Sequence, residues 1–187
     1  FKVCANPSLV SLMALSSISD IGESLIVVDN ASLTDLGNLG QVQTLPGELN
    51  INENPSLTHL DGLSGLEVVL GDVHIYGLDN LSNTNGLKNL VAVHQSLILW
   101  RNPQLRNIDG LAKLETIGGS LEISENPMLE NLVGLKNLGS IAESMMILKN
   151  PNLKAFGGLT KLGHIGQELN IELNNSLINI DEIGNVK

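Results

Sequence analysis

Apolar residues recur along the chain with a period of 24 residues. Counted from the Asn that opens most copies, unit positions 4, 7, 10, 13, 16, 20 and 22 are apolar throughout, with Thr84 as the one polar exception. The units begin at residues 6, 30, 54, 78, 102, 126, 150 and 174, without insertion or deletion. A period this strict is typical of solenoids, in which each coil contacts only its neighbours and equivalent positions stack.

The spacing inside the unit predicts strands and corners. Positions 20 and 22 alternate with outward-facing positions 21 and 23, which is the period of a strand. Elsewhere the apolar positions lie three residues apart, as in a chain that turns corners, and Gly at position 9 interrupts any amphipathic helix. We therefore expect an all-β solenoid of about seven to eight coils, with about three short strands per coil and little helix. Residues 1–187 form one solenoid domain, because the unbroken period leaves no place for a linker.

Asn-Pro marks a corner directly after the strand. Proline lacks the N–H that a strand ladder needs, and the residue before proline favours extended conformations. We interpret the Asn side chains as structural, because stacked from coil to coil they are placed to hydrogen-bond the backbone of the turn. The dipeptide occurs at Asn6-Pro7, Asn54-Pro55, Asn102-Pro103, Asn126-Pro127 and Asn150-Pro151.

The pattern L-x-I-x-x-N-P-x-L-x-x-L-x-G-L resembles the receptor L-domain family, the leucine-rich-repeat-like modules of insulin and epidermal growth factor receptor ectodomains, and the related repeats of fungal cell-wall surface proteins. The resemblance covers the whole chain. It differs from ordinary leucine-rich repeats in its Asn-x-x-Leu spacing, as in Asn102 to Leu105. It implies a right-handed, non-enzymatic solenoid at the cell surface or outside the cell, and it names no ligand.

The two ends of the sequence fall inside a coil. Phe1 occupies unit position 20 and Lys187 occupies position 14, and neither end carries a polar cap. Because solenoids need capping units to stay soluble, we expect a fragment of a longer protein that is open at both ends.

Charge excludes some classes of partner. The chain has 10 Lys and Arg against 20 Asp and Glu, a formal net charge of −10. Nucleic acid and anionic membrane surfaces reward basic patches, so we expect neither as a partner, and no segment is built for direct membrane insertion. Cys4 is the single cysteine and has no intrachain disulfide partner.

Catalytic and metal-binding signatures are absent from the sequence. It contains no Gly-rich phosphate loop, no H-E-x-x-H and no G-x-S-x-G. The four histidines, His59, His74, His94 and His164, occupy different unit positions and should point from different corners. Asp61 and Asp109 share position 8, which we interpret as a solvated polar ridge, since a calcium site needs six or more oxygens. We expect no enzyme activity, no metal and no cofactor.

The outward side of the predicted strands is unusually apolar. Tyr76 and Trp100, two of the four aromatic residues of the chain, should stack on adjacent coils, flanked by His74 and Ile98. Rigid aromatic patches are common binding hot spots. Polar coils interrupt the face into three stripes. The candidate partner-binding residues are His74, Tyr76, Ile98, Trp100, Ile26, Val28, Met146 and Leu148.

Three Asn-x-Ser sequons indicate possible glycosylation, at Asn30, Asn80 and Asn174. Asn30 and Asn174 occupy the corner position and should be engaged with backbone. Asn80 is the better acceptor.

Two classes of function fit the pattern. The first is a cell-surface or secreted recognition or adhesion module that binds a protein or glycan through its strand face. The second is a structural component of a cell wall, surface appendage or filament, in which the solenoid is a rigid scaffold that contacts copies of itself. An ice-binding solenoid ranks lower, because its flat face needs a regular row of small polar residues.

Overall fold

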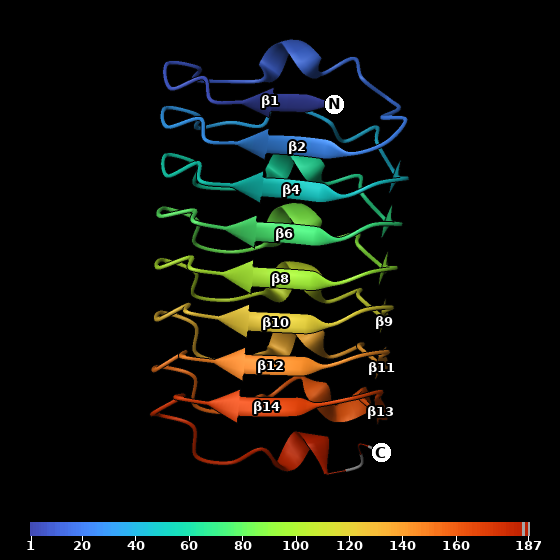
Figure 1. The fold of residues 1–187 in the computed structure, drawn as a ribbon, viewed down its shortest axis with the longest axis vertical. Coiled ribbons are helices and arrows are strands. Elements are labelled where there is room, and N and C mark those ends of the chain that lie inside the picture. Colours follow the sequence, from blue (N-terminus) through green and yellow to red (C-terminus); the bar gives the residue numbers. More distant parts are fainter. Residues whose placement is uncertain (185, 187) are drawn as a thin grey trace.

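The chain winds as a right-handed coil that repeats every 24 residues (Figure 1). This computed structural model describes residues 1–184 and residue 186. Most coils contain a strand of four residues, a strand of two residues and a 3-10 turn, and the strands stack into two parallel sheets. The structure confirms the predicted all-β solenoid.

The longer strands form an eight-stranded parallel sheet along the whole axis. Each residue pairs with the residue 24 positions away, so Leu97 lies beside Leu121 and Tyr76 beside Trp100. The strands are β1 (Lys2–Cys4), β2 (Leu25–Val28), β4 (Leu49–Asn52), β6 (Val73–Tyr76), β8 (Leu97–Trp100), β10 (Leu121–Ser124), β12 (Met145–Leu148) and β14 (Leu169–Glu172).

A six-stranded sheet of two-residue strands covers a second side of the solenoid. Its strands are β3 (Thr44–Leu45), β5 (Val68–Val69), β7 (Ala92–Val93), β9 (Thr116–Ile117), β11 (Ser140–Ile141) and β13 (His164–Ile165).

The third side carries 3-10 turns, which corrects the expectation of three strands per coil. The three-residue spacing of the apolar positions is also the period of a 3-10 helix, in which residues i and i+3 lie on one side. Gly at position 9 lets neighbouring turns approach closely: a Cβ on Gly134 would lie 1.9 Å from the carbonyl oxygen of Ile108. The turns are η1 (Met13–Leu15), η2 (Asp61–Leu63), η3 (Asn85–Leu87), η4 (Asp109–Leu111), η5 (Val133–Leu135), η6 (Leu159–Lys161) and η7 (Asp181–Ile183).

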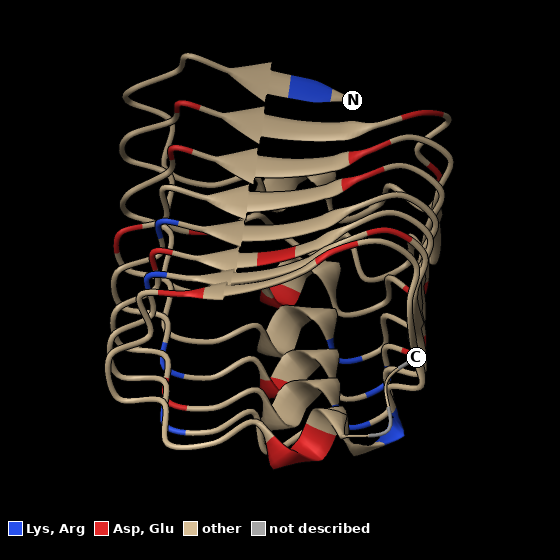
Figure 2. Ribbon diagram, turned by 60° about the horizontal axis from the view of Figure 1, so that its bottom comes forward, with Lys and Arg blue, Asp and Glu red and all other residues tan. Residues whose placement is uncertain are grey.

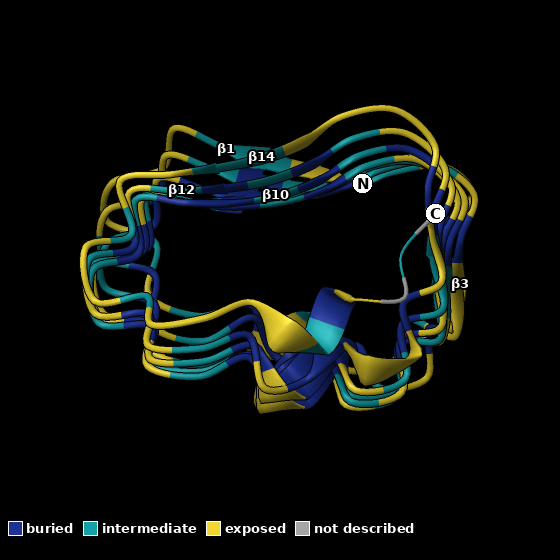
Figure 3. Cartoon of the chain, turned by 90° about the horizontal axis from the view of Figure 1, so that it is seen from below, coloured by how far each residue is buried: buried dark blue, intermediate teal, exposed yellow. Residues whose placement is uncertain are grey.

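The hydrophobic core fills the space between the long sheet and the row of 3-10 turns (Figure 3). The apolar positions of the unit supply it, and nearly all of those in the middle coils are fully buried. Thr84 takes the place that Leu60 and Ile108 hold in the adjacent coils, and its hydroxyl is buried without a hydrogen-bond partner.

The Asn side chains form the predicted row at the corner after the long strand. Asn126 is buried; its Oδ1 accepts the backbone N–H of Asn102 at 3.1 Å, and its amide donates to the carbonyl oxygens of Leu99 and Ser124. The same bonds recur at Asn30 and Asn150. The structural interpretation of Asn is confirmed.

A second polar row precedes the long strand at unit position 19. The backbone N–H of Ser120 donates to the Ser96 hydroxyl at 3.1 Å, and the N–H of Ser144 donates to the Ser120 hydroxyl. The long strands are thus held at both ends by side chains that bond the backbone of a neighbouring coil.

Candidate partner-binding surface

Tyr76 and Trp100 lie side by side at the ends of β6 and β8. Their ring centroids are 5.4 Å apart with an interplanar angle of 48°, a tilted arrangement that aromatic pairs favour. Both residues are partly buried. The predicted contact between adjacent coils is confirmed, and it fixes both rings on a rigid sheet.

The candidate face keeps the division into three stripes. His74 pairs with Ile98, so these two residues and the aromatic pair form one cluster across β6 and β8. The other four candidates lie on the same sheet but in separate stripes: Ile26 and Val28 on β2, and Met146 and Leu148 on β12.

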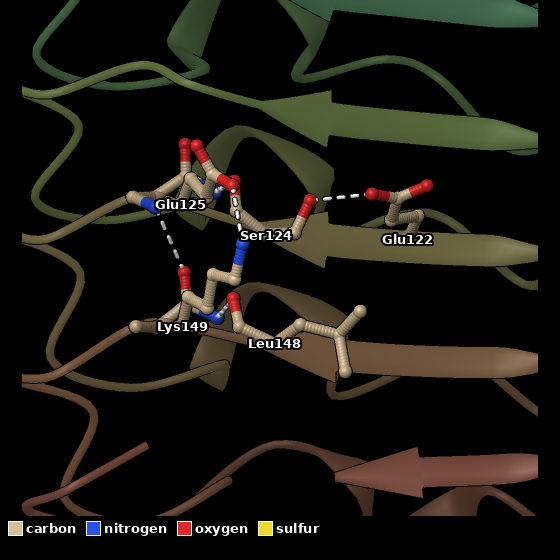
Figure 4. Close-up of polar contacts among 7 residues, drawn as sticks. Glu122, Ser124, Glu125, Leu148 and Lys149 are labelled. Atoms are coloured by element: carbon tan, nitrogen blue, oxygen red, sulfur yellow. Dashed lines mark hydrogen bonds and ion pairs between the residues drawn. The ribbon is translucent and has the colours of Figure 1, made fainter. Parts of the chain in front are cut away.

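Polar side chains separate these stripes and bond to one another within their own strand. The Asn52 amide donates to Asn50 on β4, and the Ser124 hydroxyl donates to Glu122 on β10 (Figure 4).

A groove adjoins the aromatic pair at the corner where the long strands end. It has a volume of about 510 Å³ and crosses five coils. We call it the corner groove. It is lined by Glu53, Gly77, Asp79, Arg101, Pro103, Glu125, Pro127, Lys149 and Pro151. These residues come from unit positions 24 and 2, and the sequence analysis interpreted position 2 as part of a corner and neither position as part of a binding surface.

Left-handed backbone at position 24 creates this corner. In all eight coils the residue before the corner has positive φ, from 50° at Arg101 to 63° at Gly77, although seven of these residues are not glycine. Along the strand, side chains point alternately into the core and outward, so the side chain at position 24 would point inward. The left-handed conformation instead turns position 24 toward solvent and the residue after it into the core. The remaining members are Ala5, Asp29, Glu53, Glu125, Lys149 and Leu173.

Gly77 leaves a notch in the row of position-24 side chains. A Cβ at this residue would lie 2.8 Å from Oε1 of Glu53, so the Glu53 carboxylate leans over the glycine. Tyr76 directly precedes the notch in the chain. The Glu53 carboxylate therefore occupies the notch and covers the backbone of Gly77 next to the aromatic pair.

Charges of both signs line the groove: Glu53 and Asp79 lie at one end, and Arg101, Glu125 and Lys149 alternate in sign toward the other, as the strand ends in Figure 2 show. The Lys149 ammonium lies 2.9 Å from Glu125 (Figure 4), and the Arg101 guanidinium lies 5.4 Å from the centre of the Trp100 ring, a cation–π distance. The hydrogen bond from Lys149 lowers the pKa of Glu125, with smaller contributions from the Trp100 indole and the charge of Arg101.

Other candidates lie apart from this surface. Asp61 and Asp109 are exposed on η2 and η4, where they line a second groove with Asn85 and Lys88. No group of three or more His, Cys, Asp and Glu side chains is arranged to hold a metal ion within the described part of the chain. Cys4 is partly exposed and has no disulfide.

The three sequons differ in accessibility. Asn30 is buried and its amide bonds the backbone of Val3 and Val28, while Asn174 donates to the carbonyl of Ile147. Asn80 is exposed, and its amide donates to the carbonyl of Pro55 at 2.8 Å.

Comparison with protein-family models, curated proteins and solved structures found no match. The resemblance to receptor L domains therefore stays a prediction. A separate search of the described residues found no helix with the length and apolar character that crossing a bilayer requires.

Proposed function

We propose that this chain is a non-enzymatic recognition or adhesion module of a secreted or cell-surface protein. It binds a protein or glycan partner through the cluster of His74, Tyr76, Ile98 and Trp100 and the corner groove beside it. The observation that carries the proposal is an aromatic pair fixed on a rigid sheet next to a groove with charges of both signs. Large rigid aromatic side chains contribute contact area at little entropic cost, which is why they dominate binding hot spots.

The extracellular location is part of this proposal. An exposed Asn80 sequon and the resemblance to cell-surface solenoids support it.

The test uses Trp100→Ala, because its ring contacts both Tyr76 and Arg101. We expect the variant to keep the circular dichroism spectrum of the wild type and to bind the partner at least about tenfold more weakly, as expected for a hot-spot residue. The protein is immobilised, exposed to surface extract of its source, and the retained protein or glycan is quantified by mass spectrometry. If the wild type and Trp100→Ala retained the same amount of partner, the proposal that this surface is the binding site would be wrong.

Met146→Ala is the matched control, because Met146 lies on the same sheet in a separate stripe. A partner bound at the aromatic cluster should be retained by this variant as by the wild type.

A structural role is the second candidate, and the outer stripes of β2 and β12 favour it. Ile26, Val28, Met146 and Leu148 are apolar and partly exposed, and one polar strand, β4 or β10, separates each pair from the aromatic cluster, as expected if the whole face packs against a copy of itself. In that case Met146→Ala should weaken association as much as Trp100→Ala. Light scattering of the native protein should then give a homopolymer, whereas a recognition module should be a monomer with its partner.

A further inference from the structure

The backbone N–H groups at unit position 24 in the corner groove are already paired within the solenoid. Along its floor the N–H of Glu53 donates to the carbonyl of Tyr76, that of Arg101 to Ser124, and that of Glu125 to Leu148, at 3.0 to 3.1 Å. An extended peptide therefore cannot add here as another strand, which is the usual way in which a sheet binds a peptide. Side chains must make the contacts.

The two walls of the groove differ in chemistry. Pro103, Pro127 and Pro151 stack on successive coils as a rigid apolar wall without donors. Asp79 occupies the same row as the prolines in the coil before Pro103. The opposite wall carries charged side chains, in which Glu53 and Glu125 accept hydrogen bonds and Arg101 and Lys149 donate them. The ligand therefore needs an apolar side and an edge that both donates and accepts.

The charges of the groove nearly cancel. Its lining holds three carboxylates and two cations, and Glu125 is already paired with Lys149. Glu53 and Asp79 take part in none of the ion pairs found in residues 1–184 and 186. A polyanion would meet the three carboxylates, and a polycation would meet Arg101 and Lys149, so neither fits the whole length.

We propose that the corner groove binds a neutral oligosaccharide chain that lies along the solenoid axis. A sugar ring has an apolar C–H face for the proline wall, and its hydroxyl groups both donate and accept hydrogen bonds along the charged row. Beside Tyr76, the Glu53 carboxylate over Gly77 and the carboxylate of Asp79 supply acceptors for the sugar hydroxyls. This assignment rests on the proposed recognition function and specifies its ligand class.

The length of the groove sets a length for the ligand. Five coils at a strand spacing of about 4.8 Å give about 19 Å from Glu53 to Lys149. Affinity should therefore rise with the number of sugars until the chain spans the groove and then stay constant.

The experiment is calorimetric titration of the purified protein with neutral oligomers of glucose, mannose and galactose, from disaccharide to octasaccharide, at low and high NaCl. We expect one series to bind with a length plateau and with little dependence on salt, because the ligand carries no charge. A Lys-rich peptide of similar length serves as the charged probe. Failure of every sugar series, or tight binding of the peptide that disappears at high salt, would overturn the assignment.

Gly77→Asn is the decisive variant, because its side chain displaces the Glu53 carboxylate from its place over residue 77, while Asn tolerates the left-handed backbone. Sugar affinity should fall at least about tenfold, a loss of about 1.4 kcal/mol. Ala5→Asn makes the same exchange at the same unit position, with φ of 56°, outside the groove, and should leave binding unchanged.

The two proposals fail in different ways. If surface extract is retained in a Trp100-dependent manner but no sugar series binds, recognition stands and the ligand class is wrong. If Trp100→Ala retains the extract as the wild type does, the site itself is wrong.

Discussion

Thr84 is the one polar residue at the unit positions that are otherwise apolar. Every equivalent position holds an apolar side chain, and the Thr84 hydroxyl lies in the core without a hydrogen-bond partner. A buried polar group left unpaired costs about 1–3 kcal/mol, because it has lost its bonds to water. Valine has nearly the same shape without the hydroxyl.

Thr84→Val should therefore raise the free energy of unfolding by about 1 kcal/mol. Urea denaturation followed by circular dichroism measures the change. Thr84→Ser is the control, since it keeps the hydroxyl and loses the methyl group, and it should lower stability. A drop in stability for Thr84→Val would mean that the hydroxyl is bonded in the folded protein.

Alternation along a strand was enough to predict the aromatic pair. Tyr76 and Trp100 share unit position 23, so stacking the units brings them together whatever the details of the corners. The corner groove was not predictable in this way, because the alternation breaks at position 24. Seven of these residues are not glycine, and nothing in residues such as Arg101 or Lys149 marks a left-handed conformation.

At the scale of the element, the side of the solenoid with the 3-10 turns depends on close contact between backbones. The sequence showed Gly at position 9 and apolar residues three apart, but both a polygonal corner and a 3-10 turn have this spacing. The turns meet where a side chain would not fit, as at Gly110, whose Cβ would lie 1.9 Å from the carbonyl oxygen of Thr84.

Two glycines of one coil test this contact. Gly134→Ala places its Cβ 1.9 Å from the carbonyl oxygen of Ile108, whereas the Cβ of Gly139→Ala lies 3.7 Å from that of Glu115. The first variant should lose about 1–3 kcal/mol, the usual cost of overpacking, and the second should stay within about 0.5 kcal/mol of the wild type. Thermal melts compare them. Equal stability of the two variants would contradict the close packing of the turns.

For the whole molecule, excess negative charge opposes the fold. The formal net charge is −10, and the described residues contain two Lys–Glu ion pairs, both partly exposed. Self-repulsion between like charges destabilises a compact state, and salt screens it as the Debye length falls from about 30 Å at 0.01 M to about 3 Å at 1 M.

Added NaCl should therefore raise the melting temperature by a few degrees. Lys154→Gln removes a cation that lies 2.9 Å from Glu130 and makes the net charge more negative by one, so its melting temperature should rise more steeply with salt. Differential scanning calorimetry at several NaCl concentrations measures how steeply the melting temperature rises with salt in the wild type and in Lys154→Gln. A melting temperature that falls with salt would show that attraction between opposite charges outweighs repulsion.

The left-handed corner also bears on how such a protein changes over evolution. Position 24 accepts alanine, aspartate, glutamate, glycine, arginine, lysine and leucine in one and the same backbone shape, while the Asn beside it keeps the coil closed. Single substitutions at position 24 can thus change the side chains that line the groove, one coil at a time, without a change in the backbone. A new binding specificity can therefore arise through successive point mutations, each of which leaves a protein that still folds.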